Sequence, residues 1–470
     1  MPWRNRILWL LATLPLAGCD LFNPYEQPAT DKPDSFVEKP APNLVAAGWP
    51  DPNWWNNFHS DTLSQLETKA AANNYDLGAA VARVKQADAQ VSINGAALLP
   101  SLEADAGAQR DYVHSGSTSG TGTTGGRSHN AYNANLSASY ELDFWGRNRS
   151  LLAEAQAQRD ASRYDQQVVA LTVSASVANL YFDLLATQER LAIAQDNLRS
   201  TQRTLDALNK RFAQGIISRL DVAQEANVVA EETASIPPLQ LAVSQDRDAL
   251  AVLLGQLPEK TDIPTGKLDD VAMPVVPAGL SSELLQRRPD VAEAEADLIA
   301  AHADINAARA DFFPSIGLTA SGGYQSSALG SLFDSKGQFL SLGASLAQPI
   351  FEGGLLTGQL EQAHGRYDEL EQNYRKSIVS AFADTEDALA ALQHVTEQTA
   401  AQADAVRTAK DAYALSQRQF EGGIVDITSV LNTQRSLFAA QDAWLQVRAE
   451  QLQAAVTLYK ALGGGWVKPS

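Results

Sequence analysis

The chain has 470 residues, a formal net charge of −19 at neutral pH and a single cysteine. So acidic a balance argues against nucleic-acid binding, which needs a basic surface. It is typical of long solvated helices, or of an acidic lumen that favours cations. One cysteine also excludes an intramolecular disulfide.

The first eighteen residues have the pattern of an export signal. Arg4 and Arg6 precede an apolar stretch over residues 7–14, and Leu-Ala-Gly at 16–18 precedes Cys19. This stretch is too short to span a bilayer, which needs about 20 apolar residues. A cysteine in this place resembles a bacterial lipobox, which implies a covalent lipid on Cys19. No later apolar run reaches about 18 residues, so we expect no transmembrane helix in the mature chain.

The rest of the chain is predicted to contain two similar series of elements. A segment over 19–60 that carries the lipid is followed by a helix over 61–98, two strands over 99–147 and helices over 148–257 with a turn near 215. A proline-rich connector over 258–280, which we expect to form a small belt, separates the series. The second series has a helix over 281–312, strands over 313–351, helices over 352–462 with a turn near 423, and a tail over 463–470.

Three short motifs recur about 210 residues apart, which indicates a duplicated module. Leu-Pro-Ser-Leu at 99–102 returns as Phe-Pro-Ser-Ile at 313–316, and Phe-Trp-Gly-Arg at 144–147 returns as Phe-Glu-Gly-Gly at 351–354. Arg-Phe-Ala-Gln-Gly-Ile-Ile at 211–217 returns over 418–425, which suggests one additional residue in the second copy.

Four segments alternate between apolar and polar residues, as strands with two different faces do. They cover residues 102–109, 132–144, 315–325 and 340–346. A length of about 10 to 13 residues suits a tilted strand that crosses a membrane, although half-buried strands of a soluble sandwich alternate in the same way. Four strands cannot enclose a lumen, so a barrel would be shared between chains, and three copies would supply twelve strands.

The predicted long helices exceed the size of a globular core. Residues 149–212 and 355–420 contain no proline, and their apolar residues recur at steps of three and four. A helix of this length extends about 95 Å, and the sustained spacing predicts coiled-coil packing. We therefore expect a mostly helical protein with membrane β-strands.

These features resemble the TolC-like outer membrane factors, and among them the lipoproteins of resistance-nodulation-division (RND) multidrug efflux systems. The most specific stretches are Glu-Leu-Leu-Gln-Arg-Arg-Pro-Asp-Val at 283–291, Tyr-Glu-Leu-Asp-Phe-Trp-Gly-Arg at 140–147 and Tyr-Lys-Ala-Leu-Gly-Gly-Gly-Trp at 459–466. The resemblance implies a homotrimer, with a twelve-stranded outer-membrane barrel continuous with a periplasmic α-helical barrel. It implies no cofactor and no catalysis.

The resemblance also implies a function and partners. The trimer would be a lipid-anchored exit duct in the outer membrane that passively conducts drugs or other small toxic compounds. An inner-membrane pump of the RND type and a periplasmic adaptor (membrane fusion) protein would deliver them. An exit duct for protein or peptide secretion, served by an ABC-type exporter, is the alternative.

In that family the closed tip of the helical barrel is the gate and the contact with the adaptor. The motif at the tip matches two stretches here: Gly215, Ile216, Ile217 and Ser218, and Gly423, Ile424 and Val425. Glycine suits such turns because it tolerates positive φ, so a turn glycine without any partner is the simpler interpretation. The residues predicted to latch or line the gate are Asp221, Phe420, Asp426, Thr428, Ser429, Asn432 and Arg435.

Three of these positions depart from the family pattern. Phe420 stands where some members have a tyrosine, so that hydrogen bond would be missing. Ser429 and Asn432 stand where relatives carry acids that face the pore, which leaves an aspartate ring at these sites in doubt.

Two other classes of function find little support in the sequence. The six histidines form no His-Glu-x-x-His or other metal-ligand spacing, and the glycine run at 463–465 lacks the Lys-Ser/Thr pair of a phosphate loop. A purely structural coiled-coil rod would leave the four amphipathic strands unexplained.

Overall fold

The computed structural model describes residues 24–29, 36–38, 44–46, 48–113, 127–261, 266–277, 287–466 and 468. The predicted signal peptide and Cys19 lie outside these residues. The chain divides into two compact units, and the division cuts through several helices. Unit 1 comprises Met1–Pro28, Gln86–Asp160 and Ala296–Gln372, and unit 2 comprises Ala29–Lys85, Ala161–Glu295 and Asn373–Ser470.

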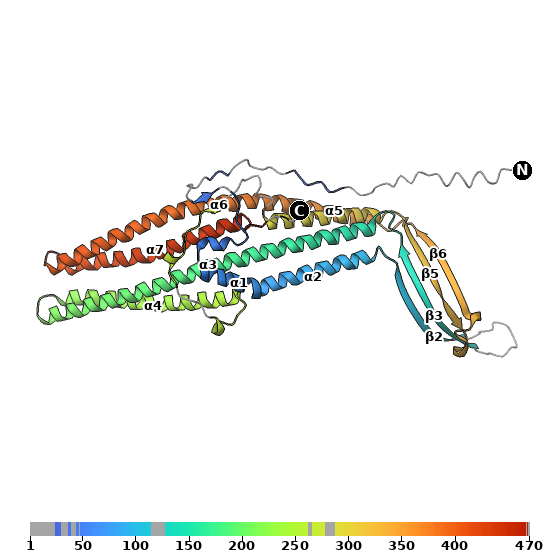
Figure 1. Ribbon diagram of the computed structural model, residues 1–470, viewed down its shortest axis with the longest axis horizontal. Coiled ribbons are helices and arrows are strands. Elements are labelled where there is room, and N and C mark those ends of the chain that lie inside the picture. The colour runs from blue at the N-terminus through green and yellow to red at the C-terminus, as the bar shows by residue number, and fades with distance from the viewer. Residues whose placement is uncertain are drawn as a thin grey trace. The chain divides into compact units, whose positions relative to one another are not determined.

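Unit 1 contains an antiparallel sheet of four strands in the order β2-β3-β5-β6 (Figure 1). The strands are β2 (Ser101–Val113), β3 (Arg127–Glu141), β5 (Ser315–Ser326) and β6 (Gln338–Ala347). Each series of the sequence therefore contributes one pair of neighbouring strands.

The apolar residues of the four strands fall in register on one face of this sheet. Leu102 pairs with Ala138, Ala138 with Ala320, and Ala320 with Leu342. This face is exposed: Leu102 is 69% and Leu342 is 75% accessible, because no described layer of the unit covers it. A soluble sandwich would bury such a face, whereas a strand that faces lipid presents it outward.

The second strand is shorter than predicted. The alternation predicted a strand as far as Phe144, but β3 ends at Glu141 because Asp143 caps the next helix. Its carboxylate accepts hydrogen bonds from the backbone N–H groups of Asn148 and Arg149, both at 2.9 Å. The connection between β5 and β6 contains two 3₁₀ turns and buries Leu332.

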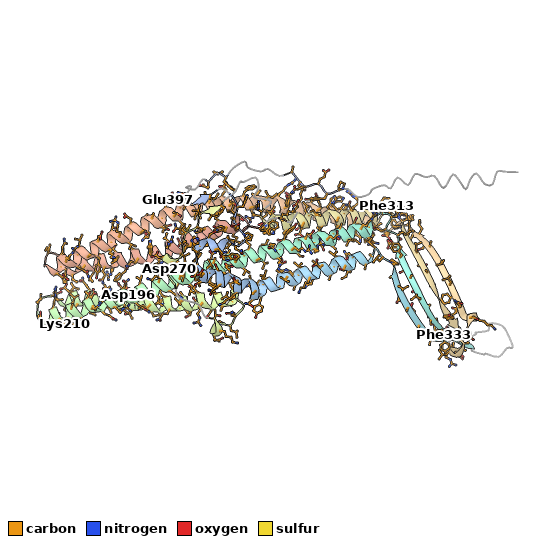
Figure 2. The ribbon with its side chains drawn as sticks, viewed as in Figure 1. Asp196, Lys210, Asp270, Phe313, Phe333 and Glu397 are labelled. Atoms are coloured by element: carbon orange, nitrogen blue, oxygen red, sulfur yellow. The ribbon has the colours of Figure 1, made fainter. Side chains whose placement is uncertain are left out.

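Aromatic residues lie at both ends of β5. Phe313, before the strand, stacks on Trp145 with ring centroids 4.8 Å apart, and Phe333, after it, meets Tyr324 edge to face at 5.5 Å. Figure 2 shows Phe313 and Phe333 at opposite ends of the sheet. Membrane strands carry aromatic girdles at the two interfaces in this way.

Four long helices follow the strand pairs. They are α3 (Arg147–Ala213) and α6 (Leu355–Glu421), of 67 residues each, and α4 (Arg219–Leu253) and α7 (Ile427–Ala461), of 35 residues each. At about 1.5 Å per residue, α3 and α6 are each about 100 Å long. The turns α3–α4 and α6–α7 have equal length, so the additional residue expected in the second turn is absent and Phe420 corresponds to Phe212.

The shorter helix expected over 61–98 is broken at Asn74. It consists of α1 (Asp61–Asn73) and α2 (Tyr75–Ala96), while α5 (Pro289–Ala310) is the described helix of the second series. Asn74 has an extended backbone, and its side-chain oxygen accepts from the N–H of Leu77 at 3.0 Å, so it caps α2. Its amide also donates to the carbonyl of Leu253, which fixes the break against the end of α4.

The core of unit 2 is aromatic around a 3₁₀ turn, η1 (Trp54–Phe58). Trp54 stacks on Tyr459 at 5.0 Å, and Phe58 packs against Phe182 at 5.1 Å. The connector packs here, because the N–H of Ala272 donates to the carbonyl of Phe58. Its strand β4 (Val276–Pro277) also pairs in parallel with β1 (Val45–Ala46).

One window of 18 residues within α3 is long and apolar enough to cross a membrane by composition, contrary to the expectation from the sequence. Of this window, 44% is buried inside the protein. A packed helix in a core passes the same test of length and composition, so the window alone is weak evidence for a membrane span.

Candidate functional site

The two tip turns have the same geometry because each needs a residue with positive φ. Gly215 has φ of +76° and Gly423 has φ of +69°. After each glycine, the next N–H reaches back to the preceding helix: Ile216 to the carbonyl of Arg211 at 3.0 Å, and Ile424 to that of Gln419 at 2.8 Å. These are the hydrogen bonds of a Schellman turn, which ends a helix abruptly.

Side-chain caps begin the next helix at each tip. Ser218 and Asp221 form a reciprocal capping box: the Ser218 hydroxyl accepts from the N–H of Asp221, and the Asp221 carboxylate accepts from the N–H of Ser218 at 2.7 Å. Asp426 accepts from the N–H and the hydroxyl of Ser429, and these bonds lower the pKa of Asp426. The bonds found for Asp221 and Asp426 therefore stabilise the starts of their own helices.

Beneath the turns lies a buried apolar group, the tip cluster, made of Leu208, Val228, Ile427, Val430 and Leu431. Ile217 packs against this cluster, whereas Ile216 is 65% and Ile424 is 75% exposed. Each tip thus presents one isoleucine to the surroundings. An exposed apolar side chain on a tight turn suits a contact with another protein.

Phe420 is part of the tip packing. Its ring lies against the tip cluster, and the guanidinium of Arg211 lies 5.1 Å from its centroid. An arginine at this distance over an aromatic face is attracted by the ring quadrupole. This cation–π contact ties the end of α3 to the end of α6.

Three of the remaining predicted gate residues lie together on α7. Thr428, Asn432 and Arg435 are exposed and share one face of α7, as their spacing of four and three residues requires. Arg435 pairs with Glu231 of α4, with Nη2 3.3 Å from Oε2. Within the chain, the structure does not bring Asp221 to these residues.

The sequence analysis missed two buried polar residues on the α4–α7 seam. Glu225 and Gln434 are both fully buried, and neither carboxylate oxygen of Glu225 nor either amide atom of Gln434 has a hydrogen-bond partner. Burial raises the pKa of Glu225 to about 7, although the charge of Arg435 lowers it. Glu225 lies midway between Val222 and Val228, so an acid at an apolar position of the helical repeat was the available signal.

Nothing in this region resembles a catalytic or metal centre. Within the parts of the chain that the structure describes, no three side chains of His, Cys, Asp or Glu are grouped to hold a metal ion. The tips instead combine exposed apolar turns, capped helices and a polar helix face.

A model of the family described as outer membrane efflux protein matches residues 66–256 and 280–464. The chain is 41% identical over 423 residues to the pyoverdine export outer membrane protein OpmQ of Pseudomonas putida, with 90% of each protein covered. It is 37% identical over 463 residues to the toluene efflux pump outer membrane protein TtgC of Pseudomonas putida, covering 96% of this chain and 93% of that protein.

Solved structures of outer membrane channels are also similar to this chain. The crystal structure of the open state of the MtrE outer membrane channel of Neisseria gonorrhoeae is similar, with a TM-score of 0.83 and 32% identity. The match covers 95% of this chain and 98% of that one. The outer-membrane channel OprN is similar as well, with a TM-score of 0.85 over 93% of this chain and 99% of that chain, at 27% identity. From sequence and structure together, the chain belongs to the outer membrane efflux protein family.

Proposed function

We propose that three copies of this chain form one exit duct of a tripartite efflux system in the outer membrane. The observation that carries the proposal is the four-stranded sheet with an exposed apolar face, in a chain that also has two helices of 67 residues. A membrane tolerates strands only in closed barrels, because open edges leave backbone groups unsatisfied. Three copies supply twelve strands, an even number in the usual range.

The helical part of the proposed duct ends in the tips, where the adaptor protein docks. Ile216 and Ile424 are the contact residues that the exposed turns favour. The partners are an adaptor and an inner-membrane pump of the RND type, as the resemblance in the sequence implies. The gate is the polar face of α7 that carries Thr428, Asn432 and Arg435. Cys19 carries the lipid anchor, which mass spectrometry of the mature N-terminus would detect.

The cargo is a set of small compounds, drugs or other toxic molecules. The relatives named above export pyoverdine or toluene, according to their names, and neither name mentions a protein cargo. An antibiotic efflux pump protein, ArpC of Pseudomonas putida, is also 36% identical to this chain over 462 residues, covering 96% of this chain and 93% of that protein. These names support small-molecule efflux over protein secretion.

The test is drug susceptibility of a strain that lacks the protein, against the same strain with the protein restored. Restoration is expected to reverse increased sensitivity to several unrelated compounds. The double variant Ile216→Asp with Ile424→Asp is expected to fail to restore resistance while reaching the outer membrane in normal amount. Leu329→Asp, an equally exposed change in the loop between β5 and β6, is the control and should restore it.

Two results would contradict parts of this proposal. If the strain that lacks the protein has unchanged drug sensitivity and no longer releases certain proteins into the culture medium, the secretion duct would be favoured. Full resistance with the double tip variant would remove the isoleucines from the adaptor contact.

A further inference from the structure

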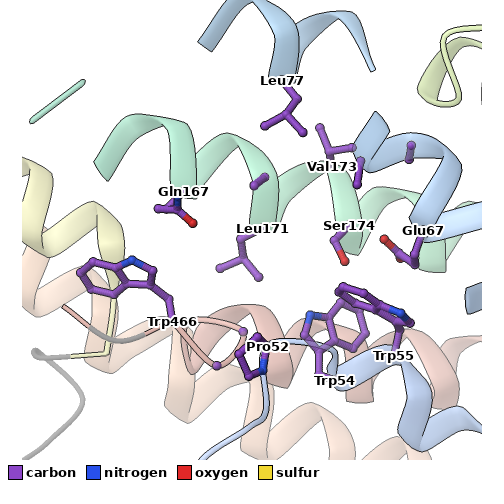
Figure 3. A pocket seen from close by; sticks show the side chains of 16 residues that line it. Pro52, Trp54, Trp55, Glu67, Leu77, Gln167, Leu171, Val173, Ser174 and Trp466 are labelled. Atoms are coloured by element: carbon purple, nitrogen blue, oxygen red, sulfur yellow. The ribbon is translucent and has the colours of Figure 1, made fainter. Parts of the chain in front are cut away.

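A cavity of about 470 Å³ lies in unit 2, away from the tips (Figure 3). Helices α1 and α3, the start of α2, the turn η1 and the C-terminal turn at 463–466 line it. Its volume is within the range of small-molecule sites, and its walls are mostly apolar. The tip function described above makes no use of this cavity.

Among the described residues that line the cavity, Glu67 is the only one that is ionisable. It is 3% exposed, and its Oε1 atom has no hydrogen-bond partner. Burial raises the pKa of Glu67 to about 8, with a smaller lowering by Ser174, which lies beside it in Figure 3. Among the described residues that line the cavity none is positively charged, and no charged side chain contributes to the pKa shift of Glu67. A buried acid without a cationic partner is costly, so its retention in an apolar cavity points to a ligand.

Three indole rings, of Trp54, Trp55 and Trp466, contribute to the walls. Trp54 is held by stacking on Tyr459 and by an edge-to-face contact with Trp55 at 5.9 Å. Trp466 meets Tyr164 edge to face at 5.7 Å. Figure 3 shows Trp54 and Trp55 close to Glu67, with Trp466 at the other end of the cavity. Rings fixed in this way require little ordering when a ligand binds, and indole faces attract organic cations.

The C-terminal turn fits the cavity too closely for side chains larger than glycine. A Cβ atom at Gly464 would come within 2.3 Å of Leu171 Cδ1, and one at Gly465 within 2.3 Å of the backbone of Asp51. Both glycines have positive φ. The turn therefore sets the position of Trp466, and the wall is formed before any ligand arrives.

We propose that this cavity binds a compact organic cation whose ammonium group pairs with the Glu67 carboxylate and whose apolar part lies against the indole rings. Glu67 releases its proton to solvent when the cation binds. The lining residues are not among those of the proposed gate or tip contact, and the test measures binding, so it does not depend on efflux.

Benzyltrimethylammonium is a suitable probe because its charge does not titrate, and neopentylbenzene is its neutral isostere. Binding to the detergent-solubilised full-length protein is measured by calorimetry and by tryptophan fluorescence. The cation is expected to bind at least about tenfold more tightly than the isostere at pH 8.5. Below pH 8 its affinity should fall about tenfold per pH unit, because the carboxyl must lose a proton first.

Glu67→Gln is expected to weaken cation binding at least about tenfold and to abolish its pH dependence. Glu225→Gln, which removes another buried carboxyl of unit 2, is the matched control and should leave binding unchanged. Trp466→Leu should weaken the cation more than the neutral isostere, which provides a second variant if Glu67→Gln does not fold.

The proposal would be overturned if the cation and the isostere bound with equal affinity, or if Glu67→Gln left the affinity for the cation unchanged. It would also be overturned if neither compound bound. If Glu67→Gln instead weakened association between copies, the group that pairs with Glu67 would come from another copy of the chain, and the ligand proposal would be wrong.

Discussion

At the scale of single residues, the side chain of Arg288 connects three helices of unit 2. Its guanidinium is buried and donates to the carboxylates of Asp290 at 2.6 Å and Asp384 at 2.9 Å. It also donates to the carbonyl of Ala461 at 3.2 Å. One side chain thus joins the start of α5, the middle of α6 and the end of α7. The planar fork of arginine provides this set of donors, and lysine does not.

Replacing Arg288 by alanine is expected to lower the free energy of unfolding of unit 2 by about 3 kcal/mol. The value lies at the lower end for a broken buried ion pair, because Asp290 and Asp384 are 37% and 54% exposed and water partly replaces the arginine. Denaturant unfolding followed by helical circular dichroism measures the change. Arg83→Ala, which breaks an exposed ion pair with Asp165, is the control and should cost no more than about 0.5 kcal/mol. Equal losses for the two variants would show that Arg288 has no special structural role.

At the scale of elements, the tip turns require glycine because of its backbone conformation and not because neighbouring atoms leave no room for a side chain. A Cβ atom added at Gly215 would meet no atom within 4 Å, but φ there is +76°. Gly215→Ala is therefore expected to destabilise the turn by about 1 kcal/mol, and to reduce hydrogen-exchange protection over residues 208–221. Gly365, inside α6, is equally free of neighbours and lacks a positive φ. Gly365→Ala should raise local protection, because alanine is the better helix former. A loss of protection at both sites would mean that the added methyl group, and not φ, is responsible.

The α4–α7 seam should respond to pH through Glu225. The folded pKa of about 7 exceeds the usual 4.5, so the folded state holds more protons than the unfolded state between these values. The free energy of opening therefore falls as pH rises from 4.5 to about 7 and is level above that. Protection factors of α4 amides should drop at least about tenfold between pH 5 and pH 8.

Glu225→Gln should keep the protection of α4 constant over this range, since glutamine does not titrate. Asp248→Asn, which changes an exposed acid on the same helix, is the control and should retain the pH dependence of the native protein. If the Glu225→Gln protein loses protection with rising pH as the native protein does, another group controls the seam.

The sequence predicted the strands and turns well, because a hydrophobic period or a glycine determines them. It predicted the ends of the helices less well, because side-chain caps determine where those helices begin. Period-two alternation located the strands, and Gly215 and Gly423 located the turns. Asn74, Asp143 and Asp221 were not recognised as caps, because a cap depends on which N–H groups lie within reach. Glu225 was missed because burial at the seam follows from the packing of α4 on α7, which the sequence does not show.

At the scale of the whole molecule, the described sheet has two free edges, β2 and β6. Both carry long runs of backbone N–H and C=O groups, and the face between them is apolar and exposed. In a membrane such edges must pair, and in water they would cause aggregation. The family model matches two separate segments, and each contains one pair of neighbouring strands followed by one long helical hairpin. The two strand pairs leave the sheet open within one chain, so the proposed barrel needs strands from other copies.

Pairing of β2 of one copy with β6 of the next predicts covalent trimers from cysteine pairs. With Ala106→Cys fixed on β2, a second cysteine is introduced in turn at positions 340, 342, 344 and 346, which share the apolar face of β6. At least one combination should give a ladder of dimers and trimers on oxidation in outer membranes, removed by reductant. Ala106→Cys alone, which retains Cys19, should give none.

The pair Ala104→Cys with Leu136→Cys is the matched control for accessibility and oxidation. These residues lie directly opposite each other on β2 and β3, so their disulfide should form within one chain without any ladder. If this control forms its disulfide and no β2–β6 pair cross-links, the barrel is not closed by these two edges. A ladder that extends beyond three chains would also exclude the trimer. A ladder that stops at three would establish which edges meet and how many copies close the barrel, because β2 and β6 are the two edge strands of the four-stranded sheet.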